Sequence, residues 1–453
     1  MSRPEVSSWQ SATAPLLRLS LPIVGVNVGM MLMGAVDTIM VGRVSPEAIA
    51  AVALGNVFFF ALSIFGVGVL LGLDPILAQA LGAHDHDGFA IGVQRGLVLA
   101  AIISVPLALA FLAAEPLLRL ARQPAEVLPL VGTYCVLLIP GMLPFLAFSV
   151  GRQSLQALQR VAPVVWTIIL ANIANIALNY VLIFGHLGFP PLGVAGSAWA
   201  STLSRWLMAL LLLWVGRDVL QDAIRPWRRE ARHLGALGRL FRLGFPIGIQ
   251  LEIEMAAFST VALLMGTFGT LHVAGHQIAL NLASLTFMVP MGVGMAAAVQ
   301  VGRAVGRSDT ASVHHSAKAA LVLGAGFMGC TALIFLAVPT VFARLYTTDP
   351  GVMAFAATLL PIAGVFQVFD GLQVVSAGIL RGLGETRAPM LINLVGFAGI
   401  GVTSSVVLAY YTPLGPVGLW WGLVIGLGVV ALILMLRVRQ LLRRPLARLH
   451  VER

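Results

Sequence analysis

Long apolar stretches occupy most of the chain, and short polar turns separate them. Each of twelve stretches is long enough, at roughly 20 residues, to cross about 30 Å of hydrocarbon as an α-helix. Transmembrane strands need only about ten residues and alternate in polarity, which these stretches do not. The pattern therefore predicts twelve transmembrane helices, over residues 16–41, 48–77, 89–114, 127–150, 161–185, 193–215, 241–268, 272–301, 319–342, 352–380, 388–408 and 417–436.

Composition agrees with this membrane interpretation. Hydrophobic residues make up 59% of the chain, charged residues only 10%, and the mean hydropathy is +0.95. Soluble domains are typically about 45–50% apolar and about 25% charged. The first apolar stretch is full length and carries Asp37, so we interpret it as a mature span rather than a cleaved signal peptide. The chain is predicted to be an all-α, multi-pass integral membrane protein.

The positive charges indicate an orientation. Most of the 28 Lys and Arg residues fall in segments on the side of the membrane that both termini share. By the positive-inside rule, both termini are predicted to be cytoplasmic. The longest polar segment, 217–240, is then a basic cytoplasmic linker that lies along anionic head groups, as does the tail RVRQLLRRPLARLH. Binding of nucleic acid is not expected. Cys135 and Cys330 both lie in predicted spans, so no disulfide is predicted.

An internal repeat divides the chain into halves. A shift of 224 residues places Pro22 on Pro246 and Gly82 on Gly306, and SLPIVG on GFPIGI. The sequence thus predicts two homologous six-helix bundles, 1–216 and 241–453, joined by the linker 217–240. Because each bundle has an even number of spans, the two are parallel repeats around a central cavity, an architecture that suits alternating access.

Signatures of common enzymes are missing. The only lysine, Lys318, follows Ala317, so the chain has no Walker A motif, and it contains neither HExxH nor GxSxG. The segment GAGFMG lies inside a predicted span, which favours helix packing over nucleotide binding. His84 and His86, in GAHDHDG, fit a solvated cytoplasmic turn better than a metal site. We therefore expect neither an enzyme nor a resident cofactor.

Polar residues at membrane depth are the candidate functional groups. Burying a carboxylate at a helix centre costs about 2.5–3.5 kcal/mol on insertion scales, so such residues usually face a wet interior and serve a purpose. Asn175 and Asn179 are four residues apart and share a helix face. Asn172 is equally consistent with a role in helix packing and with membership of the site. Arg205 either pairs with one of the buried acids or lies closer to the membrane surface than its place in the predicted span indicates. The full set is Asp37, Asp74, Asn172, Asn175, Asn179, Arg205, Glu252, Glu254 and Asp370.

Three segments resemble one transporter family. They are MGAVDTIMVGR, the long stretch that begins LGFPIGIQLEIEMAAF, and VFQVFDGLQVVSAGILRGLG. With the downstream IAAVALGN they are similar to the multidrug and toxic compound extrusion (MATE) family, in its NorM-like branch, over nearly the whole chain. The resemblance implies a secondary active multidrug efflux antiporter that exchanges Na+ or H+ for organic, often cationic, amphipathic compounds by alternating access. It also implies a bacterial cytoplasmic (inner) membrane protein, which we expect to be a monomer.

The resemblance also implies roles for particular residues. Asp37, Asn175 and Asn179 match the family's cation-coupling residues of the amino-terminal half, and Ser201 or Thr202 occupies its sixth-helix hydroxyl position. In the other half, Glu254 and Asp370 match two acids implicated in cation binding, and they are the expected Na+ ligands. Gln277 and Asn281 are further candidates for the substrate cavity, while Glu252 and Arg205 have no place on the family pattern.

Two questions stay open in the sequence. Residues two apart on a helix differ by about 200° around its axis, so Glu252 and Glu254 are not expected to face the same cavity, and we expect Glu254 to face Asp370. The other question is function, because a lipid-linked sugar or oligosaccharide flippase of the same superfamily also has two bundles. A flippase is expected to need a basic cavity for phosphates, whereas the deep charges identified here are mainly acidic.

Overall fold

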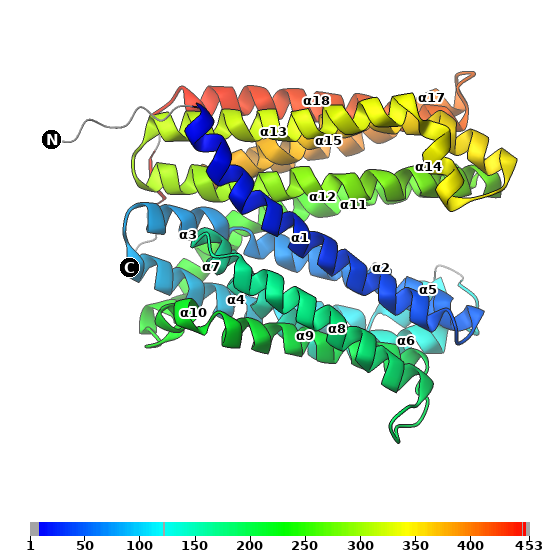
Figure 1. Ribbon diagram of the computed structural model, residues 1–453, viewed down its shortest axis with the longest axis horizontal. Helices are drawn as coiled ribbons and strands as arrows, with labels where there is room; N and C mark the ends of the chain where they lie inside the picture. Colours follow the sequence, from blue (N-terminus) through cyan, green and yellow to red (C-terminus); the bar gives the residue numbers. More distant parts are fainter. Residues whose placement is uncertain (1–8, 121–122, 446, 450–453) are drawn as a thin grey trace. The chain divides into compact units, whose positions relative to one another are not determined.

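A computed structural model describes residues 9–120, 123–445 and 447–449, and within these ranges it is helical with no strand (Figure 1). Three short helices of other types lie between α-helices: the 3-10 helices η1 (Ile139–Gly141) and η2 (Arg229–Arg232), and the π-helix η3 (Leu394–Gly401). The α-helices are α1 (Trp9–Val41), α2 (Pro46–Leu70), α3 (Leu73–Gly82), α4 (His86–Phe111), α5 (Ala114–Leu120), α6 (Leu128–Leu138), α7 (Met142–Ala157), α8 (Ala162–Phe184), α9 (Val194–Val215), α10 (Arg217–Ile224), α11 (Leu234–Gly266), α12 (Thr270–Gly306), α13 (Thr310–Ala337), α14 (Pro339–Tyr346), α15 (Pro350–Gly382), α16 (Arg387–Asn393), α17 (Val402–Tyr410) and α18 (Pro416–Leu442).

The described part of the chain contains twelve helical segments long and apolar enough to cross a membrane, which confirms the predicted number. Some are longer than their apolar stretches. The eighth is Thr270–Gly306, against 272–301 in the prediction, because the residues that flank the apolar stretch continue the helical hydrogen bonds. Three spans join consecutive helices: α2 with α3, α6 with α7 through η1, and α16 with α17 through η3.

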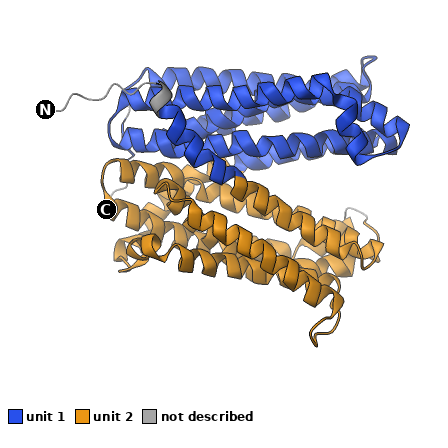
Figure 2. Cartoon of the chain, in the orientation of Figure 1, with its two compact units in different colours: residues 1–24, 249–450 blue, residues 25–248, 451–453 orange. Residues whose placement is uncertain are grey.

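The chain forms two compact units (Figure 2). Unit 2 contains residues 25–248, and unit 1 contains the described residues up to 24 together with 249–449. Helices α1 and α11 therefore each contribute to both units. The predicted division into 1–216, 217–240 and 241–453 follows chain order and stays a prediction.

The start of α1 packs in unit 1 and the start of α11 packs in unit 2, and close contacts at glycines hold both segments there. In unit 1, Gly292 of α12 lies against Ser20 and Val24 of α1. In unit 2, Gly244 of α11 lies against the backbone of Val69 in α2. A Cβ atom at either glycine would collide with these neighbours, so the small residue permits the approach of two helices.

The turn that precedes the third span of each half is repeated in detail. Asp85 caps α4 by accepting a hydrogen bond of 2.8 Å from the amide of Gly88, and Asp309 caps α13 by accepting one of 3.0 Å from the amide of Ser312. The residue before each cap, His84 or Ser308, has φ of +57°. The two caps are 224 residues apart, the same shift as in the sequence repeat. This duplicated geometry supports two homologous bundles, and it explains the GAHDHDG motif as a capped turn.

Within unit 2, α9 packs against α6, α7 and α8, and within unit 1, α15 packs against α12, α13 and α18 (Figure 1). These two central helices carry many of the buried polar side chains of their units, among them Ser201 and Arg205 on α9 and Asp370 and Gln373 on α15. The fold therefore places polar groups on the best-packed helix of each unit.

Candidate functional site

The carboxylate of Asp37 is the centre of the polar cluster in unit 2. It lies on the part of α1 that belongs to this unit, and only 5% of the residue is exposed. Its Oδ1 atom accepts hydrogen bonds from Nδ2 of Asn179 at 2.6 Å and from Nδ2 of Asn175 at 3.2 Å. Its Oδ2 atom accepts one from the hydroxyl of Ser201 at 2.6 Å. Donors from α8 and α9 thus hold a buried carboxylate by both oxygens.

The asparagines on α8 have different roles. Asn175 and Asn179 are fully buried one turn apart, and Nδ2 of Asn179 also donates to Oδ1 of Asn175 at 3.2 Å. Asn172 instead donates to two backbone carbonyls, of Gly29 at 3.1 Å and of Ile168 at 2.9 Å. Packing of α8 on α1 is therefore its role here, which resolves the alternative that the sequence left open.

The two candidate hydroxyls on α9 are also distinguished. Ser201 donates to Asp37, whereas the Thr202 hydroxyl donates to the backbone carbonyl of Leu137 in α6 at 2.7 Å. Adjacent residues on a helix point about 100° apart, so only one of them reaches α1. In unit 2, Ser201 belongs to the Asp37 cluster and Thr202 joins α9 to α6.

Arg205 supplies the positive charge that the local sequence around Asp37 lacks. It lies one turn after Ser201 on α9 and is 8% exposed. Its guanidinium carbon lies 3.5 Å from the centre of the Phe59 ring, a cation–π contact. It also interacts electrostatically with Asp37 and with Tyr134. A basic residue distant in sequence therefore attracts the negative charge of Asp37.

Unit 1 contains a second cluster, built on two acids. Glu254 on α11 and Asp370 on α15 interact electrostatically, and Gln373, one turn after Asp370, forms a hydrogen bond with Glu254. Asp370 and Gln373 are buried, and Glu254 is half-buried. Two like charges at close range in a low-dielectric interior repel strongly, so this pair favours a state in which a proton or a cation neutralises one of them.

Unpartnered oxygens mark both clusters as acceptors. Among the described residues, Oδ1 of Asp370, Oε1 of Gln373 and Oδ1 of Asn179 are buried and accept no hydrogen bond. Buried polar atoms are nearly always satisfied, so an orphaned one calls for an explanation. Carboxylate and amide oxygens are the ligands that hard cations prefer, and both clusters offer them.

The remaining predicted residues lie on α11 and α12. Glu252 is half-buried on α11, two residues before Glu254. Gln277 on α12 is exposed, and Asn281, one turn later, is half-buried. In the ranges described, no group of three or more His, Cys, Asp or Glu side chains is placed to hold a metal ion. The assignment of Na+ to Glu254 and Asp370 stays a prediction.

Sequence reasoning missed two buried arginines in unit 2. Arg95 on α4 donates from Nε to the carbonyl of Glu230 in the linker at 3.3 Å, and Arg152 on α7 donates to Oδ1 of Asn27 at 3.4 Å. Arg95 lies inside a predicted span, and Arg152 lies two residues beyond the predicted end at 150. The expectation that the deep charges are mainly acidic is therefore wrong for unit 2, where one arginine inside a predicted span and another just beyond the end of a span are buried as well.

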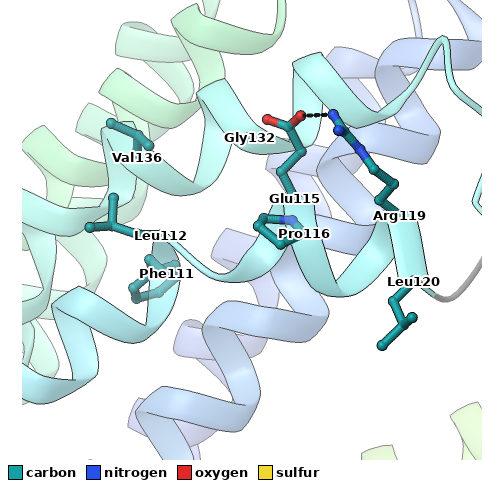
Figure 3. Close-up of a pocket in the computed structure, with 8 residues that line it drawn as sticks. All are labelled: Phe111, Leu112, Glu115, Pro116, Arg119, Leu120, Gly132 and Val136. Carbon is teal, nitrogen blue, oxygen red and sulfur yellow. Dashed lines mark hydrogen bonds and ion pairs between the residues drawn. The ribbon is translucent and has the colours of Figure 1, made fainter.

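A pocket of about 650 Å³ lies elsewhere in unit 2, between α5, α6 and the end of α4 (Figure 3). Its polar feature is an ion pair of 2.8 Å between Glu115 and Arg119. None of the predicted site residues lines it. We therefore assign the candidate functional groups to the two buried clusters rather than to this pocket.

Comparison with known proteins identifies relatives over nearly the full length. The sequence model described as MatE matches residues 22–181 and 246–407. The chain is 36% identical over 448 residues to the probable multidrug resistance protein NorM of Rhizobium meliloti (strain 1021), covering 97% of this chain and 95% of that protein. It is 34% identical over 445 residues to the multidrug resistance protein MdtK of Edwardsiella ictaluri (strain 93-146), covering 96% and 97%.

Solved structures agree on the fold. The eukaryotic MATE transporter AtDTX14 superimposes with a TM-score of 0.86 at 23% identity, over 95% of this chain and 96% of that one. A MATE protein crystallised in a bent conformation gives 0.85 at 22% identity, over 98% of both chains.

The hydroxyl of Ser201 should contribute measurably to the stability of unit 2. In Ser201→Ala, Oδ2 of Asp37 loses its donor inside the protein, and the expected cost is about 1–3 kcal/mol in the free energy of unfolding. Ser204→Ala is the matched control, because Ser204 is equally buried on α9 but donates to its own helix, to the carbonyl of Ala200. Thermal unfolding in detergent measures both. Equal losses for the two variants would show that the Asp37 contact has no special weight.

Proposed function

The chain belongs to the MATE family, in its NorM-like branch, and from this premise we propose that it is a multidrug efflux transporter that exchanges Na+ or H+ for organic, often cationic, amphipathic compounds. The printed names of the NorM and MdtK relatives support export of drugs or toxic compounds. The observation that carries the coupling mechanism is the buried carboxylate of Asp37, held by Asn175, Asn179 and Ser201.

A buried carboxylate can couple two fluxes because it has two states of charge. When a proton or Na+ neutralises Asp37, the cluster no longer attracts a cationic substrate; when the ion leaves, the negative charge attracts the substrate again. The hydrogen bonds from α8 and α9 keep the ionised form bound in place, so exchange needs no rearrangement of the first ligands. Alternating access then requires that ion and substrate reach the cluster from opposite sides of the membrane in turn.

The two acids of unit 1 support a second ion-binding position. Glu254 and Asp370 repel each other when both are ionised, and the unpartnered oxygens of Asp370 and Gln373 are hard ligands. We propose Na+ or a shared proton as the occupant. Gln277 and Asn281 on α12 remain candidates for contact with the substrate.

Membrane placement follows from the helices and the relatives. The protein is a multi-pass membrane protein, and the bacterial relatives support the cytoplasmic (inner) membrane. The charge distribution supports cytoplasmic termini, and we propose a monomer without a resident cofactor.

The alternative function, a lipid-linked sugar flippase, requires cationic groups that are free to bind phosphates. The buried arginines offer some support, but Arg95 contacts the linker carbonyl of Glu230, Arg152 contacts Asn27, and Arg205 stacks on Phe59. Expression in an efflux-deficient bacterium distinguishes the two functions. Efflux predicts resistance to ethidium and norfloxacin, whereas a flippase predicts rescue of a cell-wall precursor defect.

Replacing either central acid by its amide should uncouple transport. In Asp37→Asn and in Asp370→Asn we expect gradient-driven ethidium efflux to fall by more than about tenfold, because an amide cannot exchange a proton and binds a cation less well. Membrane vesicles with an imposed Na+ or H+ gradient provide the measurement. Glu115→Gln, in the exposed ion pair of α5, is the control and should transport normally. Wild-type efflux by Asp37→Asn would remove the coupling role of unit 2.

The neighbouring acids of α11 should differ in their effect. Glu254→Gln removes the charge that interacts with Asp370. We expect the apparent affinity for Na+ and the rate of ethidium efflux to fall by about tenfold or more, because a charged ligand is lost. Glu252→Gln should retain coupling, since it lies about 200° around the helix from Glu254. Efflux against Na+ concentration separates the two. If only Glu252→Gln loses coupling, the site has to be rebuilt around Glu252.

A further inference from the structure

Unit 2 contains a pocket of about 440 Å³ where α4, α7 and α9 meet the linker helix α10. Its inner wall is apolar, and includes Val93 of α4, Phe148 of α7 and Leu212 of α9. Neither Asp37 nor any residue bonded to it lines this pocket. Its chemistry is therefore separate from that of the proposed coupling site.

Two arginines of the linker line the same pocket. Arg217 is the first residue of α10 and Arg225 directly follows its last residue, and both are exposed. Arg217 lies 3.5 Å from the carboxylate of Asp218, but both side chains are largely exposed, and exposed ion pairs are weak. Two guanidinium groups at the rim of an apolar pocket fit an amphiphile with a phosphate head, because each guanidinium can donate two hydrogen bonds to two oxygens of one phosphate.

The surroundings of α10 are typical of a membrane interface. The helix buries Leu220 and Ala223 and exposes its charged residues. Two tryptophans flank it, Trp214 with 65% and Trp227 with 42% of its surface exposed. Exposed tryptophans gather at the level of lipid head groups, and an amphipathic helix fits the same layer. The helix itself carries Arg217, Asp218 and Asp222, so the second positive charge of the pocket comes from Arg225, just after it.

A buried glutamine fixes the linker in place. Gln94 on α4 is fully buried, and its Oε1 atom accepts a hydrogen bond of 2.9 Å from the amide of Arg228. Its Nε2 atom donates to linker carbonyls, those of Ala223 at 3.1 Å, Ile224 at 3.3 Å and Pro226 at 3.0 Å. The pocket wall that α10 forms is thus held before any ligand arrives, which lowers the entropic cost of binding.

We propose that this pocket binds one anionic phospholipid, with part of an acyl chain against the apolar wall and the phosphate between Arg217 and Arg225. A zwitterionic lipid offers the same chain but adds an ammonium group close to the two guanidiniums, so it binds less tightly. Free phosphate lacks the chain and binds weakly. The bound lipid joins the linker to α7 and α9, which stabilises unit 2.

Native mass spectrometry of the purified full-length protein tests the site with phosphatidylglycerol and phosphatidylethanolamine of equal chain length. We expect the wild type to retain one phosphatidylglycerol in preference to phosphatidylethanolamine. Each arginine near an anionic head group contributes about fivefold in affinity, so Arg217→Gln with Arg225→Gln should weaken phosphatidylglycerol binding by roughly 25-fold. Ala147→Phe, which fills the pocket from α7, should exclude both lipids.

Arg229→Gln is the matched control, because Arg229 is an exposed arginine of the same linker that does not line the pocket. It should bind phosphatidylglycerol as the wild type does. Equal losses in Arg229→Gln would show attraction to general surface charge and overturn the proposal, as would unchanged binding in the double variant. Displacement of the lipid by glycerol phosphate at comparable concentration would identify a site for the free anion instead. Ethidium efflux by Arg229→Gln and by the double variant is measured in parallel, so that failure of transport and failure of lipid binding are seen separately.

Discussion

The buried carboxylate of Asp37 is the interaction on which the arrangement of unit 2 depends. An ionised group at membrane depth is costly unless it is bound by donors, and three donors from α8 and α9 bind this one. Their presence fixes the rotation of both helices, since Asn175, Asn179 and Ser201 must all face α1. Arg205 lies one turn beyond Ser201 on the same face of α9 and adds an electrostatic interaction with Asp37. The same cluster thus holds α8 and α9 against α1 and contains the carboxylate proposed to bind the coupling ion.

The two homologous units have diverged in this chemistry. At the repeat shift of 224 residues, the position equivalent to Asp37 is Val261, which is fully buried, and the position equivalent to Glu254 is Met30. The turns before α4 and α13 have kept the same cap and the same left-handed residue. Duplication therefore retained the backbone, while one unit holds a single acid among amides and a hydroxyl and the other holds two acids with a glutamine.

Much of the fold and part of the site follow from the sequence. Twelve spans are evident because the apolar stretches are long and well separated. Asp37, Asn175 and Asn179 stand out there as isolated polar groups, but only the family resemblance grouped the two asparagines with Asp37. Sequence did not distinguish Ser201 from Thr202, or packing from ligation at Asn172, because neighbouring side chains on a helix differ only in direction. The sequence analysis also missed that α1 and α11 each contribute to both units. This arrangement rests on helix contacts at Gly244 and Gly292, which the pattern of apolar and polar residues does not reveal.

The central claim is that Asp37 changes its state of charge during exchange of ion for substrate. Infrared difference spectroscopy with isotope-labelled aspartate observes this carboxyl group directly in reconstituted protein. On addition of ethidium, the account predicts that the band of a protonated carboxyl is replaced by carboxylate bands if a proton leaves, or that the carboxylate bands shift if Na+ leaves, and either change is missing in Asp37→Asn. An Asp37 signal that ethidium, Na+ and pH all leave unchanged would contradict the account.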